Sequence, residues 1–99
     1  MPSAGGRARL DISIHGPLAR SDLAGLCDRV CRLLGEARPQ LAVCDVGGLR
    51  ADAVAVDALA RLQLAARHHG CQVRLRHASD ELRDLVHFMG LHDVLPESD

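Results

Sequence analysis

The hydrophobic and polar residues of this chain change their spacing several times along its length. Residues 10–14 alternate between apolar and polar side chains, which is typical of a half-buried strand, and Gly16-Pro17 ends this stretch. Residues 71–75 alternate in the same way. Residues 41–46 (LAVCDV) form an almost uninterrupted apolar run instead, which predicts a central strand covered on both faces.

Three other stretches carry apolar residues at three- and four-residue spacing, which predicts amphipathic helices. The first helix is expected to begin at Ser21-Asp22, an N-cap followed by an acidic first turn, and Gly35 and Pro39 are expected to end it. The second is expected from about Asp52 to His69, with Gly70 just after its end. The third follows the cap Ser79-Asp80-Glu81 and closes at Gly90.

Strands and helices therefore alternate along the chain, which indicates an α/β domain with parallel pairing and right-handed crossovers. Two of the strands keep a polar side, so we expect helices mainly on one face. We predict a single α/β sandwich domain over residues 9–96, with about four strands in a mixed or mostly parallel sheet. Residues 1–8 are expected to be a flexible N-terminal tail, and residues 97–99 a C-terminal tail.

Composition narrows the function classes. The 99 residues carry a formal net charge of −1, which predicts no bulk attraction to nucleic acid or to membrane surfaces. Phe88 is the single aromatic residue, which argues against a stacking platform for bases or sugars. No apolar run is long enough for a membrane span, and the first nine residues lack the apolar segment of a secretory signal. We therefore expect a small cytoplasmic protein with no membrane insertion.

The four cysteines are expected to be free thiols that behave as small apolar residues. Zinc is the alternative, because cysteines and histidines supply its usual ligands. The candidate ligands are Cys27, Cys31, His68, His69 and Cys71. Only half of a paired zinc motif is present, and it lies within a predicted helix, so we expect no metal and no other cofactor.

Three stretches, in this order and spacing, resemble the STAS domain family of anti-sigma factor antagonists and sulfate-transporter tails. The first ends in Ile14-His15-Gly16, and the second is residues 44–49 (CDVGGL) running into residues 59–62. The third and most specific is residues 79–85 followed by residues 89–96 (MGLHDVLP). The resemblance covers nearly the whole chain and implies a bacterial, non-catalytic domain that acts by binding another protein.

The functional centre of the family is an Asp-Ser-Ser-Gly-like sequence at the start of the second helix, where a partner kinase phosphorylates a hydroxyl. In this chain Asp52-Ala53-Val54-Ala55 takes that place when one loop residue is deleted, and Ala53-Val54-Ala55-Val56 takes it without the gap. Neither alignment contains a hydroxyl, and residues 35–78 have no Ser, Thr or Tyr. We therefore expect a partner-switch regulator that lacks the phosphoacceptor.

The resemblance also implies the site and the partners. The expected partner-binding residues are Arg50, Asp52, Ala53, Val54 and Asp57. The resemblance implies a role in the regulation of transcription. The expected partner is an anti-sigma factor, a related serine kinase or a stress-scaffold protein. Two alternatives stay open: a STAS subunit docking on the ATPase of an ABC lipid transporter, and a module that senses a small ligand.

Asp52, Val54 and the nearby Asp45 also have simpler, structural interpretations. Asp52 is also an ordinary N-cap, Asp45 is expected to brace its loop, and Val54 is as well suited to a core contact as to an interface.

The family usually begins with an additional strand, for which only about nine residues precede the first strand here. That edge is missing, or a partner supplies it, and a homodimer through it is a further alternative. We expect no enzymatic activity.

Overall fold

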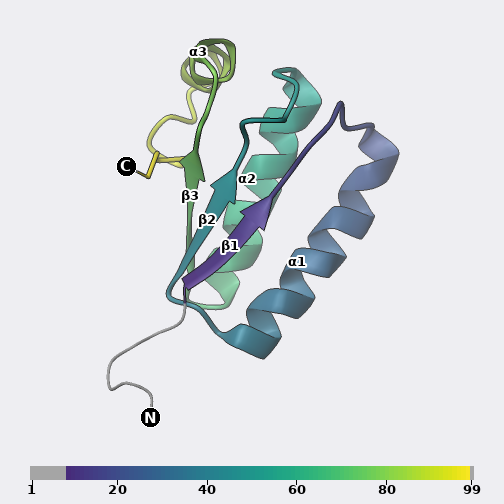
Figure 1. Ribbon diagram of the computed structural model, residues 1–99, viewed down its shortest axis with the longest axis vertical. Helices are drawn as coiled ribbons and strands as arrows, with labels where there is room; N and C mark the ends of the chain where they lie inside the picture. The colour runs from purple at the N-terminus through teal and green to yellow at the C-terminus, as the bar shows by residue number, and fades with distance from the viewer. Residues whose placement is uncertain (1–8, 99) are drawn as a thin grey trace.

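The computed structural model describes residues 9–98, in which strands and helices alternate as the sequence indicates (Figure 1). The elements are β1 (Arg9–Ser13), a 3₁₀ turn η1 (Arg20–Asp22), α1 (Leu23–Ala37), β2 (Leu41–Asp45), α2 (Ala53–His68), β3 (Gln72–Arg76) and α3 (Asp80–Phe88). The residues expected to form a flexible N-terminal tail, 1–8, lie outside the described part of the chain.

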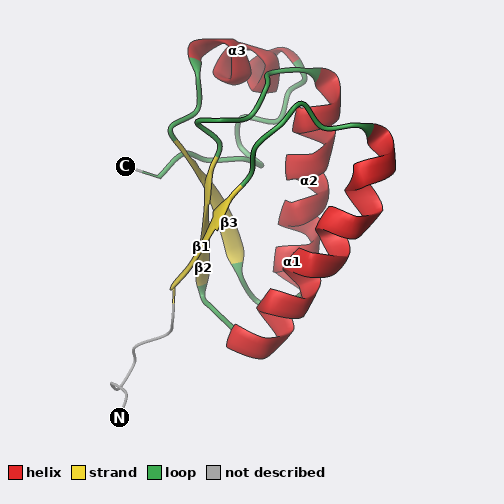
Figure 2. Ribbon diagram, turned by 45° about the vertical axis from the view of Figure 1, so that its right-hand side comes forward, coloured by secondary structure: helices red, strands yellow, loops and turns green. Residues whose placement is uncertain are grey.

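The three described strands form a parallel sheet in the order β1-β2-β3. The apolar run therefore forms the central strand, as predicted. In Figure 2 the sheet is seen nearly edge-on, and α1 and α2 lie side by side on one of its faces. The prediction of an α/β domain with helices mainly on one face is confirmed.

The core lies between this face of the sheet and the helices. Side chains from all three helices pack there against alternate residues of β2 and β3, including Cys44 and Leu75. On the opposite face Val43 is only 2% exposed, with Asp11 and Arg74 as its neighbours in register. The central strand is therefore buried on both faces, as expected. The described helices, however, do not cover the face that carries Val43.

The outer edge of β3 explains why no fourth strand is found next to it. The backbone N–H of Val73 donates to Gln63 Oε1 at 2.8 Å, and Gln63 Nε2 donates to the Val73 carbonyl at 3.0 Å. Two residues further along β3, the Leu75 N–H donates to the Pro96 carbonyl, and the Leu75 carbonyl accepts from the Ser98 N–H. A side chain and a short C-terminal segment thus pair the backbone groups that another strand would pair.

The count of about four strands is therefore not found among residues 9–98, which form three. The additional N-terminal strand typical of the family would fall in residues 1–8, outside the described residues. At the other end, Glu97 and Ser98 still contact β3 (a bridge from Glu97 to Leu75 and the hydrogen bond of Ser98), so described contacts extend past residue 96.

The predicted boundaries of the first helix need correction. The 3₁₀ turn already contains Ser21, and the Asp22 carboxylate accepts a hydrogen bond from the Ala19 N–H at 2.9 Å, outside α1. At the other end the helix continues through Gly35 to Ala37 and closes with Arg38 at φ 46°. Pro39 follows directly and prevents further helix, so of the two predicted stop signals Pro39, and not Gly35, sets this end.

The ends of the other two helices agree with the local sequence signals. Gly70 has φ 69° directly after the C-cap of α2, a conformation in which glycine avoids the Cβ clash. The Ser79 hydroxyl accepts from the Leu82 N–H at 3.1 Å and caps α3 as predicted.

Candidate functional site

The loop that follows β2 is braced by the aspartate at the end of that strand. Asp45 Oδ1 accepts a hydrogen bond from the Gly47 N–H at 3.0 Å, and Asp45 Oδ2 lies 3.1 Å from His77 Nδ1. The Gly47 N–H, and then His77, lower the pKa of the Asp45 carboxyl below its ordinary value. The predicted bracing role of Asp45 is confirmed, and the ends of β2 and β3 are joined through it.

The same loop is joined to the chain that leaves β1. The Gly16 N–H donates to the Gly48 carbonyl and the Arg50 N–H donates to the Gly16 carbonyl, both at 3.2 Å. A Cβ on Gly48 would lie 2.5 Å from Cδ2 of the exposed His15 ring, so any larger residue at this close approach would displace that side chain. The loop therefore presents the start of α2 in a fixed position.

The first turn of α2 is capped but carries no reactive group. Asp52 is extended, with φ −148°, and its Oδ1 accepts from the Ala55 N–H at 2.8 Å, which confirms the predicted N-cap. Ala53 is exposed, whereas Val54 is half-buried and packs against the core. The predicted core contact of Val54 is therefore present, and Ala53 is the residue that this turn presents to solvent.

One turn further along α2, Asp57 is held by arginines from two elements. Asp57 Oδ2 lies 3.1 Å from Arg20 Nη1, and Asp57 Oδ1 lies 3.2 Å from Arg61 Nε. These cations, Arg61 first, lower the pKa of the Asp57 carboxyl below its ordinary value. The ion pairs tie the start of α2 to the 3₁₀ turn in front of α1 and leave no free negative charge at Asp57.

The structure brings the predicted site residues together at the beginning of α2, on the loop and in its first turns. They are Arg50, Asp52, Ala53, Val54 and Asp57. Sequence reasoning missed Arg20 and Arg61. The i, i+4 spacing of Arg61 from Asp57 was a signal for one of them, but Arg20 lies 37 residues away and gave none.

Comparison with known proteins gives the family. A family model described as "Mlab, STAS domain" matches residues 4–96. The chain belongs to the STAS domain family. Among curated protein sequences none is significantly similar to it.

Two solved structures share the fold of this STAS domain. A sulfate transporter family protein from Wolinella succinogenes is 23% identical with a TM-score of 0.69, over 89% of this chain and 71% of that one. The anti-sigma factor antagonist SpoIIAA in its unphosphorylated form is 13% identical with a TM-score of 0.72, over 98% and 85%. At these identities the likeness shows the fold alone.

The cysteines of the STAS domain are free thiols. Cys44 and Cys71 are buried, and burial raises the pKa of the Cys44 thiol to about 12. Cys27 and Cys31 are half-buried on α1. Within residues 9–98 no group of three or more potential ligands gathers in a way that would hold a metal ion, and no helix is long and apolar enough to cross a membrane.

We expect the ion pairs of Asp57 to make stability depend on pH at the acid end. A carboxyl with a lowered pKa in the folded state stabilises it above its ordinary pKa of about 4, and this contribution is lost as the pH falls through the lowered value. Asp57→Asn should therefore lower the urea midpoint at neutral pH, and the difference from the wild type should shrink as the pH falls below about 4 and vanish once the carboxyl is protonated in the folded state as well. Asp84→Asn is the control, because Asp84 makes no ion pair among the described residues. A difference that persists at acid pH would contradict this account.

Proposed function

We propose that this STAS domain is a non-catalytic regulator that binds another protein through the start of α2, in the manner of an anti-sigma factor antagonist. The observation that carries the proposal is the exposed Ala53, presented at a helix start that the Asp52 cap and the Asp57 ion pairs hold rigid. A fixed surface with a small side chain at its centre suits close contact with a partner.

The chemistry of the site supports binding over catalysis. Asp57 is engaged in ion pairs, Asp45 in contacts with the Gly47 N–H and the His77 ring, and Asp52 in the cap. No nucleophile lies in the first turn of α2, where the residues are Ala53, Val54 and Ala55. The fold relative that carries the name anti-sigma factor antagonist supports the same class of function.

The absence of a hydroxyl at the start of α2 determines how we expect the domain to be regulated. In the alignment that places Asp52-Ala53-Val54-Ala55 on the Asp-Ser-Ser-Gly position, no side chain can accept a phosphoryl group. The domain is then fixed in the state that corresponds to an unphosphorylated relative, and its partner in the cytoplasm is bound without control by a kinase at this site.

Affinity capture from a lysate of the source organism, read by mass spectrometry, tests the proposal. The bait pair is Arg50→Glu, an exposed charge reversal beside the cap, and Arg32→Glu, the same reversal at an exposed position on α1. We expect the wild type and Arg32→Glu to enrich an anti-sigma factor, a related serine kinase or a stress-scaffold protein, and Arg50→Glu to lose it. Asp52 is not a suitable position, because its replacement removes the cap of α2.

Three other outcomes would overturn the proposal. Enrichment of a transporter ATPase would assign the alternative function, a STAS subunit of an ABC lipid transporter. Equal binding by all three baits would place the interface elsewhere on the domain. Loss of binding by both variants would show that net charge, and not the start of α2, governs the interaction.

A further inference from the structure

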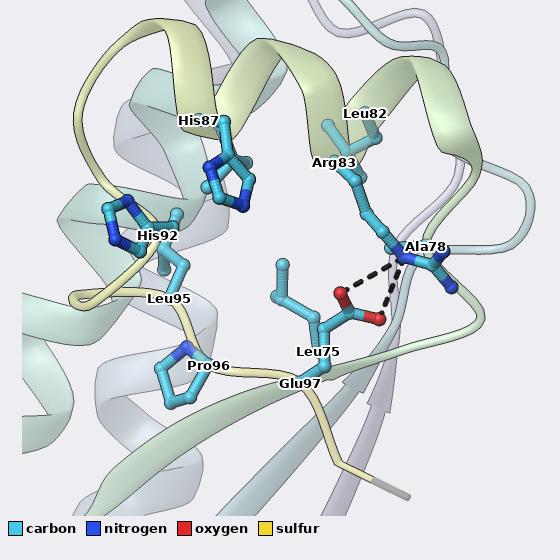
Figure 3. A pocket seen from close by; sticks show the side chains of 10 residues that line it. Leu75, Ala78, Leu82, Arg83, His87, His92, Leu95, Pro96 and Glu97 are labelled. Atoms are coloured by element: carbon cyan, nitrogen blue, oxygen red, sulfur yellow. Dashed lines mark hydrogen bonds and ion pairs between the residues drawn. The ribbon is translucent and has the colours of Figure 1, made fainter.

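A cavity of about 190 Å³ lies between α3, the end of β3 and the C-terminal segment (Figure 3). Its walls are mainly aliphatic. They include the core residues Leu75, Leu82, Val86 and Leu95, and Pro96 of the C-terminal segment. Pockets for drug-sized molecules measure roughly 300–1,000 Å³, so an occupant of this one must be small and largely apolar.

The polar groups of the cavity lie on two sides. In Figure 3, Arg83 and Glu97 face each other on one side, while His87 and His92 lie on the other, beside Leu95. Arg83 Nε is 3.0 Å from the Glu97 carboxylate, and Arg83 Nη1 is 3.3 Å from Asp80. This guanidinium and this carboxylate therefore satisfy each other.

The two imidazoles keep hydrogen-bonding capacity. Their rings are stacked with centroids 4.5 Å apart and planes 1° from parallel. His87 makes no side-chain hydrogen bond among the described residues, and the one polar contact of His92 there is with Asp93, whose Oδ1 lies 3.4 Å from Nε2. Each ring therefore keeps nitrogen atoms without a partner among the described residues, and each can donate a hydrogen bond to an acceptor group at the mouth.

The geometry points to a binding site for a small organic carboxylate, with its aliphatic body in the cavity and its head group against His87 and His92. A cationic head would meet no free carboxylate in the cavity lining, because Arg83 already neutralises Glu97 and Asp93, beside His92, lies outside that lining. A neutral alcohol would accept one hydrogen bond, whereas a carboxylate accepts from both rings, and such charged hydrogen bonds are the stronger ones. This site is independent of the protein-binding surface proposed at the start of α2.

Titration with three ligands of the same chain length tests the site, with amide signals of the ¹⁵N-labelled protein as the readout. Hexanoate should shift the signals of Ala78, Leu82 and Val86, which line the cavity. Hexan-1-ol should bind at least about tenfold more weakly, and hexylamine should bind least. Equal affinities for the three ligands, or shifts only elsewhere in the protein, would overturn the proposal.

Two variants complete the test. Replacing both exposed rings, His87→Ala with His92→Ala, should weaken hexanoate at least about tenfold and weaken hexan-1-ol much less. His68→Ala, an exposed histidine in the last turn of α2, is the matched control and should change neither. Val86→Phe should fill the cavity and abolish binding of both ligands. Unchanged hexanoate binding in the double variant would refute the role of the imidazoles, whether or not the Val86 variant folds.

Discussion

Replacing Gln63 by leucine is expected to lower the free energy of unfolding by about 3 kcal/mol. The Gln63 side chain is 1% exposed and makes three hydrogen bonds, two with the backbone of Val73 and one, at 2.6 Å, to the carbonyl of Val94. Leucine has a similar volume, so the cavity cost is small. The variant leaves one N–H and two carbonyl groups without these partners, at about 1–3 kcal/mol each, and added apolar burial offsets part of this loss.

Urea denaturation of Gln63→Leu beside Gln72→Leu measures this effect. Gln72 lies on β3 next to Val73, but its side chain is exposed, so its replacement should change stability by less than about 0.5 kcal/mol. Equal stabilities for the two variants would mean that water or a shifted backbone replaces the amide contacts. The pairing of the outer edge of β3 by Gln63 would then not be needed for the fold.

Gln63 also shows where sequence reasoning stops. The periodicity of the helix places it among apolar residues, but its partners lie 10 and 31 residues further along the chain. Nothing in the local pattern indicates that an amide side chain substitutes for a neighbouring strand. The prediction of about four strands did not address this edge, because the additional strand of the family is N-terminal and would fall in residues 1–8, outside the described residues.

Local signals, in contrast, were reliable. The caps formed by Asp52 and Ser79 involve backbone groups three residues away, and the sequence contains both members of each contact. The start of the first helix was misjudged because Ser21 and Asp22 form a 3₁₀ turn whose aspartate bonds backward to Ala19. A cap signal alone does not show on which side of the residue the bond forms.

The site divides in the same way. The resemblance to the STAS family predicted five residues as one group at the start of the second helix, namely Arg50, Asp52, Ala53, Val54 and Asp57. The contact of Arg20 with Asp57 depends on how α1 packs against α2, and this tertiary geometry could not be predicted from spacing. The consequence for function is that the proposed surface includes a residue from in front of α1.

The proposed interface leads to a second large effect, on affinity, at Ala53. The substitution Ala53→Asp in this domain should weaken its binding to the partner captured by the wild-type protein on the order of 100-fold. The new carboxylate would be buried against the partner without a counter-charge, which costs several kcal/mol. The fold should tolerate the change, because Ala53 is exposed and an acidic residue in the first turn of a helix is favourable.

Ala53→Asn is the matched control for this prediction, since it has nearly the same shape and no charge. We expect it to weaken binding only several-fold, as measured by calorimetry or interferometry with the purified partner. Equal losses of affinity for Ala53→Asp and Ala53→Asn would show that the contact does not accommodate a larger side chain at this position and does not depend on its charge. Tight binding by both would remove Ala53 from the interface. A large loss for Asp alone would mean that this helix start keeps the charge sensitivity of a phosphorylated switch, although its own side chains can no longer carry the phosphate.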